Sequence, residues 1–242
     1  MPPVGDRKRL EARVARKTFR TASGQSVDVI ADLFFALEEG EIGALIGPSG
    51  CGKSTLMRIL AGLDRNFEGS VRVPAHWRIG MAFQEPRLLP WRSLEDNVRL
   101  AAPEASEAAI AALFAALGLS EHRTHFPGEL SLGLARRAAL ARAFAVRPTL
   151  LLLDEPFVSL DAPLARQLQR DLARLVASRG ITTVLVTHDV DQAIALADRI
   201  FVLSARPAHV IGEIRVAEPR SETSAEEGRA IAARIETLRG EG

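Results

Sequence analysis

The chain has 242 residues, of which 47% are hydrophobic and 25% are charged. This composition is typical of a soluble globular protein and excludes a largely disordered one. The 31 basic and 30 acidic residues give a formal net charge of +1, so there is no basic excess to indicate a nucleic-acid-binding protein. The one cysteine excludes an intramolecular disulfide and is compatible with a reducing compartment.

The N-terminal segment MPPVGDRKRLEARVARK is charged and has no apolar centre, so it does not resemble a secretory signal. No uninterrupted apolar run approaches the roughly 20 residues that a membrane-spanning helix needs. We therefore expect that any work at a membrane depends on other chains.

The predicted elements alternate between strands and helices after a first region of short antiparallel strands, which ends near Gly40. Short apolar segments predict buried parallel strands at 41–47, 78–83, 149–155, 182–188 and 199–204. Helical patterns occupy 53–63, 104–120, 133–147, 164–180 and 189–198. This alternation predicts an α/β fold with a mainly parallel sheet.

The whole chain, residues 1–242, is predicted to form a single domain. Its middle part, about 94–147, is helical without a convincing strand, and we interpret it as a helical subdomain inserted into the order of the sheet. The polar tail, about 217–242, predicts a surface helix and is too short for a separate regulatory domain.

A glycine-rich loop, GPSGCGKST, follows the apolar segment EIGALI and opens a helix. It fits the phosphate-binding pattern G-x-x-x-x-G-K-[ST], in which backbone N–H groups and a helix N-terminus surround phosphate oxygens. Lys53 would place a cation on the β and γ phosphates, and the Ser54 hydroxyl would ligate Mg²⁺. The alternatives are a purely structural turn and a redox role for Cys51, which stands at a variable position of the pattern. The candidate nucleotide-binding residues of the loop are Gly47, Pro48, Ser49, Gly50, Cys51, Gly52, Lys53, Ser54 and Thr55.

Two carboxylates, Asp154 and Glu155, end the apolar segment LLLLDEP. The carboxyl edge of a parallel sheet is where α/β proteins bind ligands. There Asp154 would hold Mg²⁺ and Glu155 would polarise a water for attack on the γ phosphate. The alternative is an acidic turn that only caps the strand.

Together these motifs resemble the ATP-binding subunits of ABC transporters over about residues 19–203. The resemblance implies a P-loop NTPase with a RecA-like, mainly parallel sheet, an N-terminal antiparallel β subdomain and an inserted helical subdomain. It also implies ATP and Mg²⁺ as cofactors and ATP hydrolysis as the activity. Residues 47–55 resemble the Walker A loop of this family, and LLLLDEP resembles its Walker B strand.

Further single residues acquire roles through the resemblance. Gln84 matches the Q-loop glutamine, which meets Mg²⁺ and couples the site to the membrane subunit. His188 matches the switch histidine at the γ phosphate, so the implied catalytic residues are Glu155, His188 and Gln84. Phe19 stands where the family places an aromatic side chain on adenine, and SLDA at 159–162 matches the D-loop with Asp161.

The segment LSLGL at 130–134 occupies the place of the LSGGQ signature. In the family this loop and its helix N-terminus bind the γ phosphate of ATP held by a partner subunit. Ser131 and Gly133 are retained, while Leu132 and Leu134 replace a glycine and a glutamine. We expect ATP capture to persist with slower turnover or a modified dimer interface. The alternative is a serine that only caps a helix.

One phosphate loop and one signature imply a second ATPase subunit, most simply an identical one in a head-to-tail dimer. The resemblance further implies two membrane permease subunits, a periplasmic solute-binding protein acting through them, and a peripheral position at the cytoplasmic face of the bacterial inner membrane. In RLLPWRSLEDNV, the Leu-Pro-Trp step resembles importers of the nitrate, sulfonate and taurine group. Trp91 is interpreted equally as a permease contact or as local core.

Two other kinds of ABC protein stay open as alternatives: a soluble non-transport ATPase, and an exporter or lipid-transport ATPase. Soluble members often carry two ATPase units or long coiled-coil insertions, and neither is visible here. A P-loop kinase would not explain Gln84, Ser131 and His188 together.

Overall fold

In the computed structural model the described residues are 8–158, 160, 162–216 and 224–241. They form two compact units. The first combines the chain up to Trp77 with the chain from Thr182 onward, and the second runs from Arg78 to Ile181. Each unit is described by itself below.

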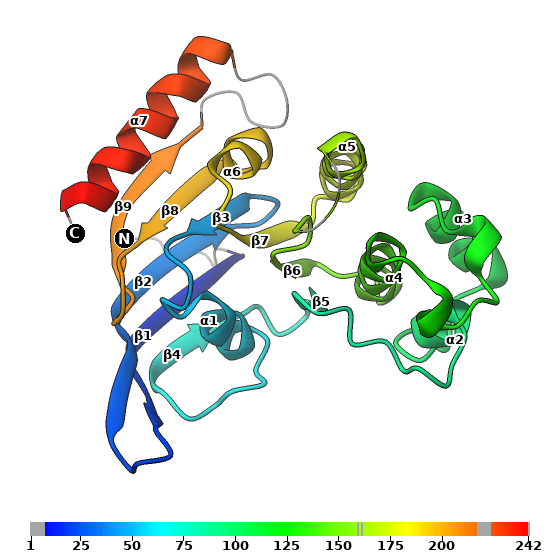
Figure 1. Ribbon diagram of the computed structural model, residues 1–242, viewed down its shortest axis with the longest axis horizontal. Coiled ribbons are helices and arrows are strands. Elements are labelled where there is room, and N and C mark those ends of the chain that lie inside the picture. The colour runs from blue at the N-terminus through cyan, green and yellow to red at the C-terminus, as the bar shows by residue number, and fades with distance from the viewer. Residues whose placement is uncertain (1–7, 159, 161, 217–223, 242) are drawn as a thin grey trace, which may run out of the picture. The chain divides into compact units, whose positions relative to one another are not determined.

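The first unit contains an antiparallel sheet in the order β2-β1-β4 (Figure 1). Its strands are β1 (Arg9–Arg20), β2 (Ser26–Glu38) and β4 (Glu68–Arg72). The expected short strands are thus wrong in length, since β1 and β2 have 12 and 13 residues. On β1 the buried Leu10, Ala12 and Val14 alternate with charged residues. Such alternation is the signature of a strand with one buried face.

The same unit holds parallel strands, as the sequence predicts. β3 (Ile42–Ile46) pairs in parallel with β7 (Thr182–Thr187) and with β8 (Arg199–Leu203). β9 (Val210–Arg215) adds an antiparallel strand beside β8. Every residue of β3 and β7 is buried, which explains the apolar sequence of β3 and the absence of charged residues from β7. The helices of this unit are α1 (Lys53–Leu60), α6 (Val190–Leu196) and α7 (Ala225–Glu241).

The polar tail forms α7, as expected, but this helix is more than a solvated surface element. Ile231, Ile235 and Leu238 are buried on one side of it. A Cβ atom at Gly212 of β9 would lie 2.5 Å from a methyl carbon of Leu238. A glycine at that position therefore lets the helix pack closely on the strand.

The second unit pairs β5 (Ile79–Ala82) in parallel with β6 (Leu150–Asp154). Its helices are α2 (Leu94–Arg99), α3 (Glu107–Ala116), α4 (Leu132–Ala145) and α5 (Ala162–Arg179), with short 3₁₀ turns η1 (Ser120–His122) and η2 (Pro127–Glu129). α2, α3, η1, η2 and α4 occupy the segment expected to be helical. The assignment of all 242 residues to one domain stays a prediction.

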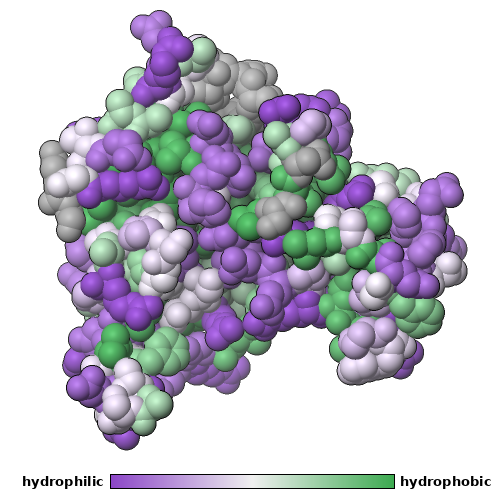
Figure 2. All heavy atoms as spheres, in the orientation of Figure 1, coloured by the Kyte–Doolittle hydropathy of each residue, from purple (hydrophilic) through white to green (hydrophobic). Residues whose placement is uncertain are grey.

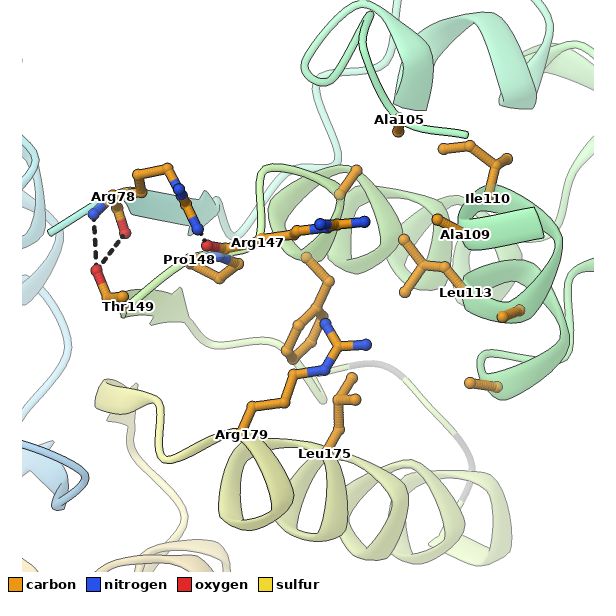
Figure 3. A pocket seen from close by; sticks show the side chains of 14 residues that line it. Arg78, Ala105, Ala109, Ile110, Leu113, Arg147, Pro148, Thr149, Leu175 and Arg179 are labelled. Atoms are coloured by element: carbon orange, nitrogen blue, oxygen red, sulfur yellow. Dashed lines mark hydrogen bonds between the residues drawn. The ribbon is translucent and has the colours of Figure 1, made fainter. Parts of the chain in front are cut away.

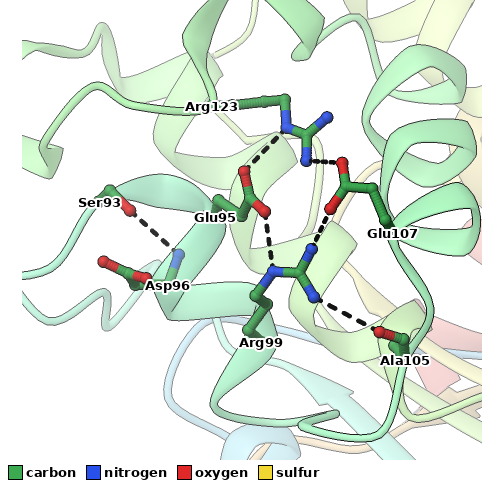
Figure 4. A network of polar contacts seen from close by, with 7 residues as sticks. All are labelled: Ser93, Glu95, Asp96, Arg99, Ala105, Glu107 and Arg123. Atoms are coloured by element: carbon green, nitrogen blue, oxygen red, sulfur yellow. Dashed lines mark hydrogen bonds and ion pairs between the residues drawn. The ribbon is translucent and has the colours of Figure 1, made fainter.

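A network of ion pairs joins the helices of the second unit (Figure 4). The Glu95 carboxylate of α2 accepts hydrogen bonds from Arg99 Nε at 2.8 Å and from Arg123 Nε at 2.9 Å. Glu107 at the start of α3 pairs with both arginines. The hydrogen bond from Arg123 is the main cause that holds the Glu95 pKa below its ordinary value. The network thus fixes α2 and α3 to the segment after η1.

The described part of the chain contains no helix that is long and apolar enough to cross a membrane. Figure 2 shows hydrophilic residues over much of the visible face, interspersed with hydrophobic patches.

Candidate active site

The phosphate loop connects β3 to α1 in the first unit. Gly50 and Gly52 have φ angles of 76° and 132°, which L side chains rarely adopt. At Gly52 a Cβ atom would also lie 3.0 Å from Val29 Cγ1. Gly52 is the N-cap of α1 and supplies no side-chain hydrogen bond to it. The N–H groups of the first turn therefore have no side-chain cap, which leaves the helix N-terminus suited to an anion.

Lys53 lies folded back across this loop. Its side chain is buried, and Nζ donates hydrogen bonds to the carbonyl oxygens of Gly47 at 2.7 Å and Pro48 at 2.9 Å. These bonds hold the ammonium group inside the loop, where phosphate oxygens would compete for it. Cys51 is also buried, so a redox role lacks the solvent access that a reactive thiol needs.

His188 follows β7 at the surface of the same unit. It lines a hollow of about 390 Å³ together with Gly47, Pro48 and Ser49. The next residue, Asp189, caps α6 by accepting a hydrogen bond from the Gln192 N–H at 3.1 Å. The structure thus brings the predicted switch histidine and the start of the phosphate loop to one hollow.

The second unit brings Gln84 and Glu155 together. Parallel pairing of β5 and β6 sets Ala82 beside Leu153, so the residues after the two strands meet. Gln84 Nε2 lies 3.5 Å from Glu155 Oε2. Asp154 ends β6 with only 4% of its surface exposed.

Glu155 has a φ of +48°, a left-handed conformation that is costly for a residue with a side chain. Such strain is characteristic of residues whose side-chain direction matters for function. Here it re-aims the carboxylate directly after a fully buried strand.

Ser131 caps α4, and its hydroxyl accepts a hydrogen bond from the Leu134 N–H at 3.3 Å. The capping role considered from the sequence is therefore real. It does not exclude binding across a dimer, because a hydroxyl keeps a donor and a second lone pair. Ser131 is exposed, and so is Leu132. At Gly133 a Cβ atom would lie 3.1 Å from Leu160 Cδ2, so a larger residue there would crowd its neighbour.

Two residues that anchor the segment after Gln84 are not predicted from the sequence. Arg142 of α4 donates hydrogen bonds to the carbonyl oxygens of Arg87 at 2.7 Å and Pro86 at 2.8 Å. Burial lowers the pKa of Arg142. It thus ties the signature helix to the segment that follows Gln84. An arginine on a helix gives no signal of this role in the sequence.

Asn97 of α2 is the second anchor. Its amide oxygen accepts from the Leu89 N–H at 2.7 Å, and its Nδ2 group donates to three carbonyl oxygens, those of Leu89, Arg92 and Ser93. The buried Asn97 side chain therefore fixes the backbone of the Leu-Pro-Trp step. Trp91 is 69% exposed, so its interpretation as local core is wrong.

The remaining candidates are placed as follows. Phe19 is 45% exposed on β1, with Lys17 Nζ 4.7 Å from the centre of its ring. Asp161 and Ser159 of the predicted D-loop lie outside the described residues.

The predicted metal ligands fit Mg²⁺ by their chemistry. The hydroxyl of Ser54, the amide oxygen of Gln84 and the carboxylate of Asp154 are hard oxygen donors, which Mg²⁺ prefers to nitrogen or sulfur. In the described parts of the chain no three His, Cys, Asp or Glu side chains form a metal-binding group. A set with one carboxylate is the kind that leaves coordination positions to water and substrate phosphates.

Comparison with known proteins decides the family, because residues 30–158 match the family model described as ABC transporter. The chain belongs to the ABC transporter family. It is 42% identical over 208 residues to the aliphatic sulfonates import ATP-binding protein SsuB 2 of Pseudomonas syringae pv. tomato, covering 86% of this chain and 87% of that one. It is 48% identical over 197 residues to SsuB 1 of Streptomyces avermitilis, covering 81% and 75%.

Solved structures give the same assignment. The ATP-binding cassette MJ0796, a dimer in a post-hydrolysis state with ADP and phosphate, is 26% identical with a TM-score of 0.77, covering 86% of this chain and 99% of that chain. A second dimeric structure of this bacterial cassette gives a TM-score of 0.78. The predicted P-loop NTPase fold and ATP hydrolase class are thereby confirmed, and the chain is the ATP-binding subunit of an ABC importer.

Proposed function

We propose that this ABC ATPase powers the uptake of aliphatic sulfonates or closely related small organic anions. Two observations of kinship support the cargo class: the name shared by the relatives of known function, and the Leu-Pro-Trp step that resembles importers of the nitrate, sulfonate and taurine group. The nucleotide-binding motifs carry no information about the cargo.

Binding of ATP is assigned to the phosphate loop and its surroundings. Lys53 and the N–H groups that begin α1 bind the β and γ phosphates, because both are positive donors in a loop shaped for an anion. Residues 47–52 and Thr55 complete the loop. Phe19 stacks on adenine.

Hydrolysis is assigned to Glu155 as the general base, which takes a proton from the attacking water. Gln84, at hydrogen-bond distance from that carboxylate, orients it. His188 contacts the γ phosphate and stabilises its developing charge. Ser54, Gln84 and Asp154 would hold Mg²⁺, which neutralises phosphate charge when bound.

The assembly is a head-to-tail dimer of two copies. In it Ser131 and Gly133 bind the γ phosphate of ATP held by the other copy, and Asp161 contributes from the D-loop. The dimer acts on two membrane permease subunits and, through them, on a periplasmic solute-binding protein. We assign it to the cytoplasmic face of the bacterial inner membrane as a peripheral protein.

Contact with the permease is assigned to the segment around Trp91. An indole that is 69% exposed on a loop fixed by a buried asparagine is suited to a partner, since aromatic anchors dominate interfaces. Asn97 and Arg142 hold the loop at both of its ends. A permease helix that presses on Trp91 would thus reach Gln84 through an ordered segment.

The test is affinity purification of tagged Glu155→Gln chain from detergent-solubilised membranes with ATP and Mg²⁺, followed by mass spectrometry. A polytopic permease should co-purify, and its recovery should fall at least about tenfold with Trp91→Ala added, as for an interface hot spot. The matched control is Leu63→Ala, which removes another exposed apolar side chain. An eluate that holds only soluble proteins would contradict the proposal.

A further inference from the structure

The second unit contains a hollow of about 510 Å³ that the nucleotide chemistry does not use (Figure 3). It lies among α3, the segment after α4 and the end of α5. Its volume falls within the range of small-molecule sites. Its lining combines aliphatic and aromatic side chains with three arginines.

The charge of this hollow is positive and unbalanced. Arg78, Arg147 and Arg179 line it, and no acidic residue does. In the described part of the chain none of these three arginines forms an ion pair with a carboxylate. Figure 3 shows the guanidinium groups of Arg147 and Arg179 directed toward the hollow from two different segments. This arrangement favours an anion.

Arg147 is held in place by its backbone just after α4. Its φ of +49° is the left-handed conformation that commonly ends a helix, and its N–H donates to the Phe144 carbonyl at 3.0 Å. Arg78 adds further bonds, since its Nε donates to the Arg147 carbonyl at 3.0 Å and its N–H donates to Thr149 Oγ1 at 2.7 Å. These contacts fix the point from which the Arg147 side chain extends.

Apart from Thr149, the remaining lining is apolar. It includes Ile110 and Leu113 of α3, together with Phe144 and Leu175. A neighbouring hollow of about 340 Å³ shares Phe144 and Leu175 with the first and is lined mainly by apolar side chains, together with Asp171, Arg174 and Ser178. A ligand of the first hollow therefore needs a charged end and an aliphatic part.

We propose that this hollow binds an amphiphilic organic anion, with its headgroup between Arg147 and Arg179 and its alkyl chain along α3 and α5. This inference goes beyond the importer function, and only the imported sulfonate as ligand source rests on that proposed function. The ligand chemistry fits two sources, an imported aliphatic sulfonate and a fatty acid from the membrane.

The test uses the full-length chain and octanesulfonate below its micelle concentration, measured by isothermal titration calorimetry. We expect one saturable site, with affinity rising up to about fourfold for each added methylene group across a series of chain lengths. Sulfate, which lacks the chain, and octanol, which lacks the charge, should each bind at least about tenfold more weakly.

Variants separate this site from general surface charge. Arg147→Gly removes the guanidinium and keeps a residue that accepts positive φ. This variant and Arg179→Gln should each weaken octanesulfonate binding at least about tenfold, while the exposed control Arg215→Gln should leave binding unchanged. Unchanged binding in both pocket variants, or an equal loss in the control, would overturn the proposal.

Two further comparisons complete the test. Tighter binding of octanesulfonate than of octanoate would indicate the imported sulfonate, and the reverse order would indicate a fatty acid. ATP affinity, measured on the same variants, should not change. A defect in nucleotide binding is thereby distinguished from a defect at this hollow.

Discussion

At the scale of single residues, Lys53 shows how the phosphate loop is stabilised from within. Its ammonium group is satisfied by the two loop carbonyls of Gly47 and Pro48, so the charge is buried without a carboxylate. A phosphate offers stronger, charge-assisted partners. Binding of ATP would then exchange two neutral acceptors for charged ones and needs little rearrangement of the loop.

Replacing Lys53 with methionine should therefore weaken ATP binding at least about tenfold, because a hydrogen bond to a charged group contributes about 1.5–3 kcal/mol. Nucleotide titration by calorimetry measures the effect. Lys8→Met, which removes a lysine that pairs only at long range with Glu39 at 3.8 Å, is the control. An affinity for ATP within twofold of the original chain would contradict the role of Lys53.

Ser131 combines a cap with a predicted role across the dimer, and two substitutions separate them. Ser131→Ala should lower the stability of the chain by about 1 kcal/mol through loss of the cap. Ser131→Asp keeps a capping side chain but places a negative charge where the γ phosphate would lie. It should retain the melting temperature and abolish ATP-driven dimerisation, as followed by thermal unfolding and light scattering. If the Ser131→Asp chain still dimerised with normal affinity, the role of Ser131 across the dimer would be contradicted and only its capping role would remain.

Two residues can be placed near one another from the sequence where each directly follows a recognisable strand. The meeting of Gln84 and Glu155 follows from two strands that end at one sheet edge. The roles of Asn97 and Arg142 do not follow from the sequence, because each binds backbone carbonyls, at 4 to 8 residues' separation for Asn97 and at 55 and 56 for Arg142. Such contacts leave no pattern of residue types.

At the scale of elements, the ion-pair network around Glu95 makes the stability of the folded chain depend on pH. Hydrogen bonding by Arg123 lowers the Glu95 pKa in the folded chain below the ordinary 4.5. A group whose pKa is lower in the folded state stabilises that state above its unfolded pKa, and this contribution is lost as the pH falls through the folded value.

Glu95→Gln should accordingly be less stable than the original chain at pH 7, with a difference that shrinks as the pH falls below about 4.5. Urea unfolding at pH 7, 4 and 3 measures it. Glu121→Gln, at an exposed position of η1, is the control and should show no such dependence. A difference for Glu95→Gln that stays constant over this range would contradict the network's contribution.

The packing of α4 on β5 depends on Gly80. A Cβ atom there would lie 2.3 Å from the Ala143 carbonyl oxygen, and backbone cannot move away as a flexible side chain can. Gly80→Ala should thus destabilise the chain by about 1–3 kcal/mol. Thermal unfolding measures this, with Gly128→Ala as the control because nothing lies within 4 Å of its added carbon. Equal melting temperatures for the two variants would show that the strand and helix adjust freely.

Whether a helix or strand is predicted from the sequence depends on how clear its pattern of apolar residues is. Fully buried, largely apolar strands such as β3, β6 and β7 are predicted within a residue or two. β4 and β9 are not anticipated, since their sequences EGSVR and VIGEIR carry little apolar pattern and their pairing with β1 and β8 forms them. The length of β1 and β2 likewise comes from pairing with each other.

At the scale of the whole molecule, the order of the motifs along the chain makes the family predictable. A phosphate loop, a glutamine, a signature, a carboxylate pair and a histidine follow one another in a single sequence. The cargo is not predictable in this way, because the motifs that identify the family bind the nucleotide and not the cargo. The assembly stands between these cases, since the proposed dimer takes one half of each site from each copy.

The most direct measurement is the oligomeric state of purified Glu155→Gln chain, by size-exclusion chromatography with light scattering. This variant removes the base and should slow hydrolysis at least about a hundredfold, so bound ATP persists. The account predicts a dimer with saturating ATP and Mg²⁺, and a monomer with ADP or when Ser131→Asp is added. A Glu155→Gln chain that stays monomeric with saturating ATP and Mg²⁺ would contradict the claim that two copies bind ATP between them.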